Sequence, residues 1–112
     1  MDLASAINEM IGYQEHQCPI ENAKDLACKA PYSKEISFCH MVEEVGEIGT
    51  CLNNEVTKRK ELSEPLRNEC VDVINCALEL FFMDGGTIEE FYDVIEKKQG
   101  KWKQNLERLN GN

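Results

Sequence analysis

The sequence predicts an all-α protein, an antiparallel bundle of about four main helices. Three observations support this prediction. No stretch shows sustained alternation of apolar and polar residues, apolar residues recur at three- and four-residue spacing, and glycine and proline separate the periodic stretches. The 112 residues are enough for one compact domain, which we expect to span residues 1–112.

The first helix is expected to run from Asp2 to about Gln17 and to end near Cys18 and Pro19, because proline interrupts a helix interior. Residues 19–32 are interpreted as a connection with room for a short helix from Glu21 to Cys28. The apolar stripe of the first helix consists of Leu3, Ile7, Met10 and Ile11.

The second main helix is expected to begin at Ser33, a residue type that caps helix N-termini. Residues 53–62 are polar and become basic, which indicates a helix end and an exposed link. Gly46 and Gly49 lie one turn apart, each at a cost of about 1 kcal/mol relative to alanine. Close approach of another helix would explain them, and a tolerated cost without any contact is the alternative. The predicted core-facing stripe is Phe38, Met41, Val45, Ile48 and Leu52.

The third main helix is expected to open at residues 63–65, where Ser63 can cap it and Pro65 is tolerated in the first turn. Asp84-Gly85-Gly86 ends it. Thr87 and Glu90 have the spacing of a capping box for a fourth helix through about Leu109, which Gly100 is expected to weaken midway. The predicted apolar face of the third helix is Leu66, Cys70, Val73, Ala77 and Phe81.

Charge and composition exclude several classes of partner. Twelve Lys and Arg against 21 Asp and Glu give a net charge of −9, which repels nucleic acids and anionic membranes unless a strong basic patch is present. The start of the chain has neither a basic region nor a long apolar run, so we expect a cytoplasmic protein without a membrane segment. Six cysteines without a Cys-x-x-Cys motif are expected to be reduced thiols.

Two pairs of carboxylates stand out on the two central helices. Glu44 and Glu47 are three residues apart on one, and Glu69 and Asp72 are three apart on the other, so each pair shares a helix face beside an apolar stripe. Four carboxylates that converge would repel unless a cation neutralises them, and Mg²⁺ or Mn²⁺ prefers such oxygen ligands. Two solvated acidic faces are the alternative.

Other kinds of site are poorly supported. A di-iron bundle needs Glu-x-x-His on two helices, but Ser37 stands three residues before His40 and Tyr13 three before His16. The chain also has no zinc-ligand spacing, no phosphate-binding glycine-rich loop and no local nucleophile motif. A site built on carboxylates is therefore the preferred hypothesis.

The carboxylates form a recognisable pattern. Glu43-Glu44-Val45-Gly46-Glu47, 21 intervening residues and Glu69-Cys70-Val71-Asp72 resemble the Glu-Glu-x-x-Glu and Glu-x-x-Asp signature of the MazG-like all-alpha nucleoside triphosphate pyrophosphohydrolases. The resemblance covers roughly residues 36–108. It implies that Glu44, Glu47, Glu69 and Asp72 are catalytic magnesium ligands, with Glu43 beside them to orient water.

The end of the chain adds a second similarity. Lys101-x-x-x-Asn105-x-x-Arg108 is similar to the basic, Asn-containing stretch with which this family binds phosphate, and Lys97 or Lys98 could replace Lys101. Independently of the family, residues 97–108 carry five cations and one acid. Their alternative role is to complement the negative end of a helix.

The resemblance implies Mg²⁺-dependent hydrolysis of a nucleoside triphosphate, or its deoxy form, to the monophosphate and pyrophosphate, with Mn²⁺ as a substitute. It also implies nucleotide-pool house-cleaning by a homodimer or a dimer of dimers, in which oligomerisation completes the bundle. The base could stack on Phe38, Trp102 or Tyr13, with core packing as the alternative. The rival functions are a noncatalytic acidic module that binds a protein partner and a metal-binding bundle without turnover.

Overall fold

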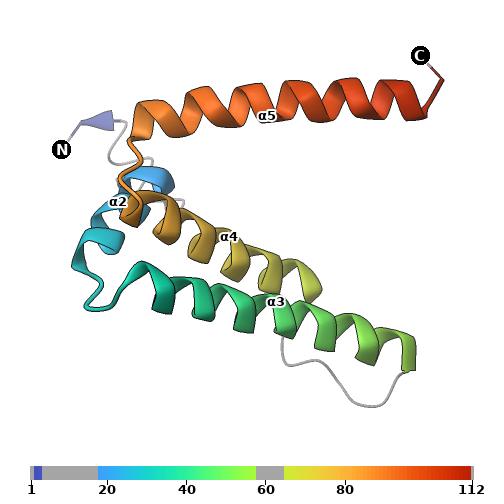
Figure 1. Ribbon diagram of the computed structural model, residues 1–112, viewed down its shortest axis with the longest axis horizontal. Helices are drawn as coiled ribbons and strands as arrows, with labels where there is room; N and C mark the ends of the chain where they lie inside the picture. The colour runs from blue at the N-terminus through green and yellow to red at the C-terminus, as the bar shows by residue number, and fades with distance from the viewer. Residues whose placement is uncertain (1, 4–17, 58–64, 112) are drawn as a thin grey trace.

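The computed structural model describes residues 2–3, 18–57 and 65–111, and over these ranges it is all-helical (Figure 1). The helices are α2 (Pro19–Lys29), α3 (Lys34–Thr57), α4 (Leu66–Met83) and α5 (Ile88–Leu109). The all-α prediction is therefore confirmed for the described residues. The first expected helix lies outside them, apart from Asp2 and Leu3.

Helix α2 confirms the short helix expected within residues 19–32 and extends it at both ends. It begins at Pro19, whose fixed φ suits the first helical position. Its Ala27 is buried with Leu78 and Phe82 of α4, so this segment forms part of the core. Around these three residues pack Ile20, Ala23, Phe81, Met83, Ile88 and Phe91.

Helix α3 starts as predicted, because the Ile36 backbone N–H donates to Ser33 Oγ at 3.3 Å. The helix ends at Thr57, within residues 53–62, where the sequence predicted a helix end. Cys51 and Asn54 are both buried and lie three residues apart on one helix face. Their packing extends the helix past the polar residues.

Helices α4 and α5 follow the local signals with one exception. Pro65 is not in the first turn of α4 but immediately precedes it, in an extended conformation, and its carbonyl oxygen accepts from the Asn68 N–H at 2.9 Å. The expected cap Ser63 lies outside the described ranges. Gly85 follows α4 with φ +90°, as a helix stop requires, and Thr87 Oγ1 accepts from the Glu90 N–H at 3.0 Å at the start of α5.

Helices α3 and α4 lie side by side, and polar groups join them (Figure 1). At one end Lys34 Nζ lies 3.1 Å from Asp84 Oδ1. Further along, Glu79 accepts hydrogen bonds from the hydroxyls of Ser37 and Tyr32, both at 2.8 Å. Ser37 is fully buried, so its bond to Glu79 satisfies a hydroxyl that water cannot reach.

The apolar stripes predicted to face the core are partly open in this chain. Phe38, Val45 and Leu52 of α3 are each about half exposed, and Cys70 and Ala77 of α4 are exposed as well. The prediction that Phe38, Val45 and Leu52 face the core is therefore wrong for the described part of one chain. The reason is that α3 turns a neighbouring stripe toward α4, with buried or half-buried residues recurring every seven positions at Ser37, Glu44 and Cys51.

Helix α5 extends away from α3 and α4. Only its first turns approach α2, and the Phe91 ring lies 5.8 Å from the Phe81 ring at the turn between α4 and α5. All described residues after Phe91 are exposed. Helix α5 runs through Gly100 without interruption. None of the described helices is long and apolar enough to cross a membrane.

The helical glycines have open space around them. A Cβ added at Gly46 or Gly49 would meet no atom within 4 Å. Among the described residues, therefore, no second helix of this chain makes the close approach that was one explanation of these glycines. The same open space surrounds Gly100.

Replacing Gly100 by alanine is expected to stabilise the protein by about 0.5–1 kcal/mol, because alanine loses less backbone freedom in a helix interior. Urea denaturation measures the change. The matched control is Gly85→Ala, which should destabilise by about 1–2 kcal/mol because φ there is positive. A Gly100→Ala variant less stable than wild type would contradict this reading of α5.

Candidate metal centre

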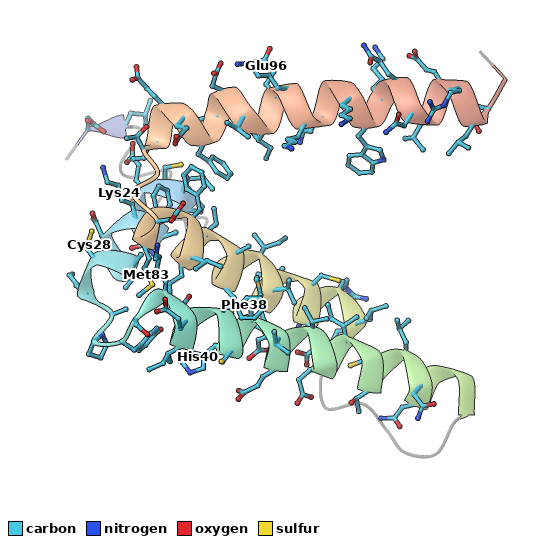
Figure 2. All side chains as sticks on the ribbon, in the orientation of Figure 1. Lys24, Cys28, Phe38, His40, Met83 and Glu96 are labelled. Carbon is cyan, nitrogen blue, oxygen red and sulfur yellow. The ribbon has the colours of Figure 1, made fainter. Side chains whose placement is uncertain are left out.

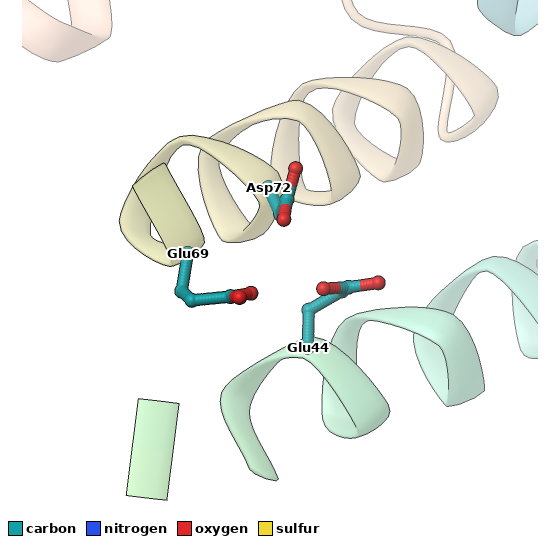
Figure 3. A group of neighbouring side chains, drawn as sticks. All are labelled: Glu44, Glu69 and Asp72. Atoms are coloured by element: carbon teal, nitrogen blue, oxygen red, sulfur yellow. The ribbon is translucent and has the colours of Figure 1, made fainter. Parts of the chain in front are cut away.

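Three carboxylates from two helices converge in the structure (Figure 3). Glu44 of α3 faces Glu69 and Asp72 of α4, and one oxygen of each lies within 4.8 Å of the others. Glu69 is buried, with 8% of its surface exposed, while Glu44 and Asp72 are half-buried. The geometry thus brings together three of the four carboxylates proposed from the sequence as ligands.

The packing of α3 on α4 explains why these side chains meet. Glu69 and Asp72 are three residues apart and share a face of α4. Glu44 lies seven residues after Ser37, and Asp72 lies seven before Glu79, so the hydrogen-bonded pair and the carboxylate cluster are separated by two helical turns on both helices. The bond between Ser37 and Glu79 therefore sets the register that places Glu44 beside Asp72.

The other predicted site residues lie elsewhere. Glu43 and Glu47 are exposed and are not part of the cluster. Lys101, Asn105 and Arg108 are exposed on α5, away from α3 and α4, and Arg108 Nη2 donates to Asn105 Oδ1 at 3.3 Å. The structure of one chain does not bring these α5 residues to the carboxylates.

Glu79 and its partner Tyr32 join α3 to α4 but were not predicted from the sequence. Glu79 was not singled out because it does not belong to either carboxylate pair. The sequence feature that could have identified Glu79 is its spacing of seven residues from Asp72, which keeps both on one face of α4. Tyr32 also contacts the ring of His40 edge to face, at 5.1 Å between ring centres, so His40 packs at this end of the α3–α4 contact.

The pKa of the Cys76 thiol is affected by the negative charges along the contact of α3 with α4. Partial burial raises its pKa first, and the negative charges of Glu44, Glu79 and Asp72 raise it further. A cation bound by these carboxylates would oppose this negative potential. The field along the contact of α3 with α4 is therefore suited to a positive ligand.

The thiol of Cys18, at the start of α2, has a pKa shifted in the opposite direction from that of Cys76. The pKa of Cys18 is lowered, mainly by its hydrogen bond to Tyr92 at 3.6 Å and then by backbone N–H groups at the start of α2. The same contact raises the pKa of Tyr92. Cys18 immediately precedes α2, contacts Tyr92 of α5 and takes no part in the carboxylate cluster.

The aromatic residues considered for base stacking are differently placed. Phe38 lines an apolar groove of about 710 Å³ between α3 and α4, together with Met41, Ala77, Leu80 and Phe81. Trp102 is exposed on α5, and Tyr13 lies outside the described ranges. Of the three, only Phe38 is therefore seen to line a hollow beside the helices that carry the carboxylates.

The cluster fits a hard divalent cation by its chemistry. All three ligand groups offer oxygen, the donor that Mg²⁺ and Mn²⁺ prefer, and Mg²⁺ in proteins commonly uses one or two carboxylates with water and phosphate oxygens. Three carboxylates leave coordination positions for such oxygens.

Comparisons of the chain with protein-family models, with curated proteins and with solved structures found no match.

Millimolar Mg²⁺ or Mn²⁺ is expected to raise the thermal unfolding temperature relative to a chelator, because a ligand that binds only the folded state stabilises it. At a hundredfold excess over Kd the gain is about 2.7 kcal/mol. Asp72→Asn should remove most of the shift, whereas Glu35→Gln, an equal loss of charge on α3 outside the cluster, should retain it. Equal melting temperatures with metal and with chelator would count against the site.

Proposed function

We propose that the protein hydrolyses a nucleoside triphosphate, or its deoxy form, to the monophosphate and pyrophosphate, with Mg²⁺ as cofactor and Mn²⁺ as a substitute. One observation carries this proposal. Glu44 belongs to the first half of the MazG-like signature, Glu69 and Asp72 belong to the second, and their carboxylate oxygens lie within 4.8 Å of one another. The proposed physiological role is house-cleaning of the nucleotide pool in the cytoplasm.

The side chains of the cluster are assigned separate roles. Glu44, Glu69 and Asp72 hold the cation, and Glu47, one turn from Glu44 at the exposed edge of α3, completes the ligand set once a nucleotide is present. Glu43 orients water. A bound Mg²⁺ supplies charge neutralisation at the phosphates and lowers the pKa of water.

The basic residues of α5 are proposed to bind the phosphate chain. Arg108 and Asn105 already face each other at 3.3 Å, and an arginine guanidinium suits phosphate oxygens. Because α5 points away from α3 and α4, these residues would serve a nucleotide held by another copy of the chain. This arrangement favours a homo-oligomer over a monomer.

The open face of α3 and α4 also supports assembly. Phe38, Val42, Val45 and Leu52 of α3 and Val71 and Ile74 of α4 are each about half exposed. We propose that a second copy packs its α3 and α4 against this pair to complete a four-helix antiparallel bundle, in a homodimer or a dimer of dimers. Such packing would give Gly46 and Gly49 a close helix neighbour, which the described residues of one chain do not provide.

Pyrophosphate release from a panel of nucleoside triphosphates, with Mg²⁺ and with chelator, tests the activity. We expect Mg²⁺-dependent release, reduced by about 100-fold or more in Glu44→Gln and Asp72→Asn, because several kcal/mol of charge stabilisation is lost. Glu21→Gln, an equal loss of charge on α2 outside both the cluster and the groove, is the control with near wild-type activity.

The rival functions give different outcomes in the same assay. Metal binding without release from any nucleotide would support the bundle without turnover. Neither binding nor release would favour the protein-interaction module. Wild-type turnover in both cluster variants would remove these carboxylates from the reaction.

Arg108→Ala is expected to raise KM for the triphosphate by about 10-fold or more, since a hydrogen bond to a charged group contributes about 1.5–3 kcal/mol, and to leave metal affinity unchanged. Lys103→Ala, on another face of α5, is the control. Steady-state kinetics with a parallel metal titration separates the two effects. An unchanged KM would transfer phosphate binding to Lys97, Lys98 or Lys101.

A further inference from the structure

The two halves of α5 carry opposite charge. From Ile88 to Glu96 the helix has four acids and no cation, whereas residues 97–108 have five cations and one acid. The acids of the first half are Glu89, Glu90, Asp93 and Glu96, and the cations of the second half are Lys97, Lys98, Lys101, Lys103 and Arg108.

The helix dipole explains only part of this separation. Acids in the first turn and cations in the last turn stabilise a helix, but the effect decays within one turn of each end. Glu96, Lys97 and Lys98 lie in the middle of a 22-residue helix. Lys97 pairs with Asp93 of its own helix at 3.2 Å, and that exposed pair contributes little to stability. The central charges therefore need another explanation.

An apolar stripe runs the length of the same helix. Ile88, Ile95, Trp102 and Leu109 recur every seven residues, the repeat by which helices pair along a seam. Ile88 packs against the core, but Trp102 and Leu109 are 63% and 77% exposed. Leu106 borders them and is also exposed.

No other described helix lies beside this stripe after the first turns of α5 (Figure 2). Glu96 points to the side away from α3 and α4 in the same view. A seven-residue apolar repeat on a helix of about 33 Å is thus left without a partner among the described residues, which a folded protein rarely tolerates.

We infer that α5 pairs with α5 of a second copy in antiparallel orientation. The acidic half of each helix then lies beside the basic half of the other, whereas a parallel pair would place five cations against five. Full overlap would place Ile95 beside Trp102 of the partner subunit. The contact is related by a two-fold axis, as most homodimers are, and it uses a different surface from the α3–α4 face of the proposed bundle.

The sole tryptophan of the chain provides the probe. Pairing should shield Trp102 from acrylamide in the wild type, and Leu106→Glu should expose it and halve the mass measured by sedimentation equilibrium. Gln104→Glu adds the same charge on the opposite face of α5 and should change neither result. The measurements need neither nucleotide nor metal, so their outcome is independent of the proposed hydrolysis.

Charge reversal tests the orientation. Lys98→Glu with Lys103→Glu should halve the mass, as should Glu89→Lys with Glu96→Lys, and the combined fourfold variant should regain the wild-type mass. A monomeric wild type, a shielded Trp102 in Leu106→Glu at unchanged mass, or no recovery in the fourfold variant would overturn the inference. The first two results would assign the stripe to contacts within one chain.

Discussion

The register of α3 on α4 determines which side chains of the two helices meet. Glu79 fixes it by accepting hydrogen bonds from Ser37 and Tyr32, and loss of Glu79 would leave the buried Ser37 hydroxyl unsatisfied, at a cost of about 1–3 kcal/mol. Two turns further along, the same register brings Glu44 beside Asp72. A shift of one residue would rotate Glu44 away from α4 and separate the carboxylates.

This contact uses polar residues where a stable core would use apolar ones. Clustered carboxylates repel in the absence of a cation, and the buried apolar cluster is small, with Ala27, Leu78 and Phe82 at its centre. The apolar stripes of α3, α4 and α5 meanwhile remain open. The proposed cation would neutralise the carboxylates, and the proposed second copy would cover the apolar stripes that the described residues leave open.

Local signals in the sequence were sufficient for the helix boundaries at Ser33, Gly85 and Thr87, because caps and positive φ depend on a few neighbouring residues. The spacing of the carboxylates was sufficient to bring Glu69 and Asp72 onto one face. The face that α3 presents to α4 could not be predicted, because periodicity marks the most apolar stripe, whereas the helices meet along the stripe of Ser37 and Glu44. For the same reason the exposure of Glu47 and the role of Glu79 emerged only from the packing.

The central claim, that the carboxylates between α3 and α4 bind a divalent cation, is tested most directly by paramagnetic broadening of amide NMR signals with substoichiometric Mn²⁺. We expect selective loss of signals around residues 41–48 and 68–76, reversed by excess Mg²⁺ and absent in Asp72→Asn. Signals of α5 should persist in Leu106→Glu, which removes the proposed pairing of α5. Broadening centred elsewhere, or equal broadening in Asp72→Asn, would contradict the account.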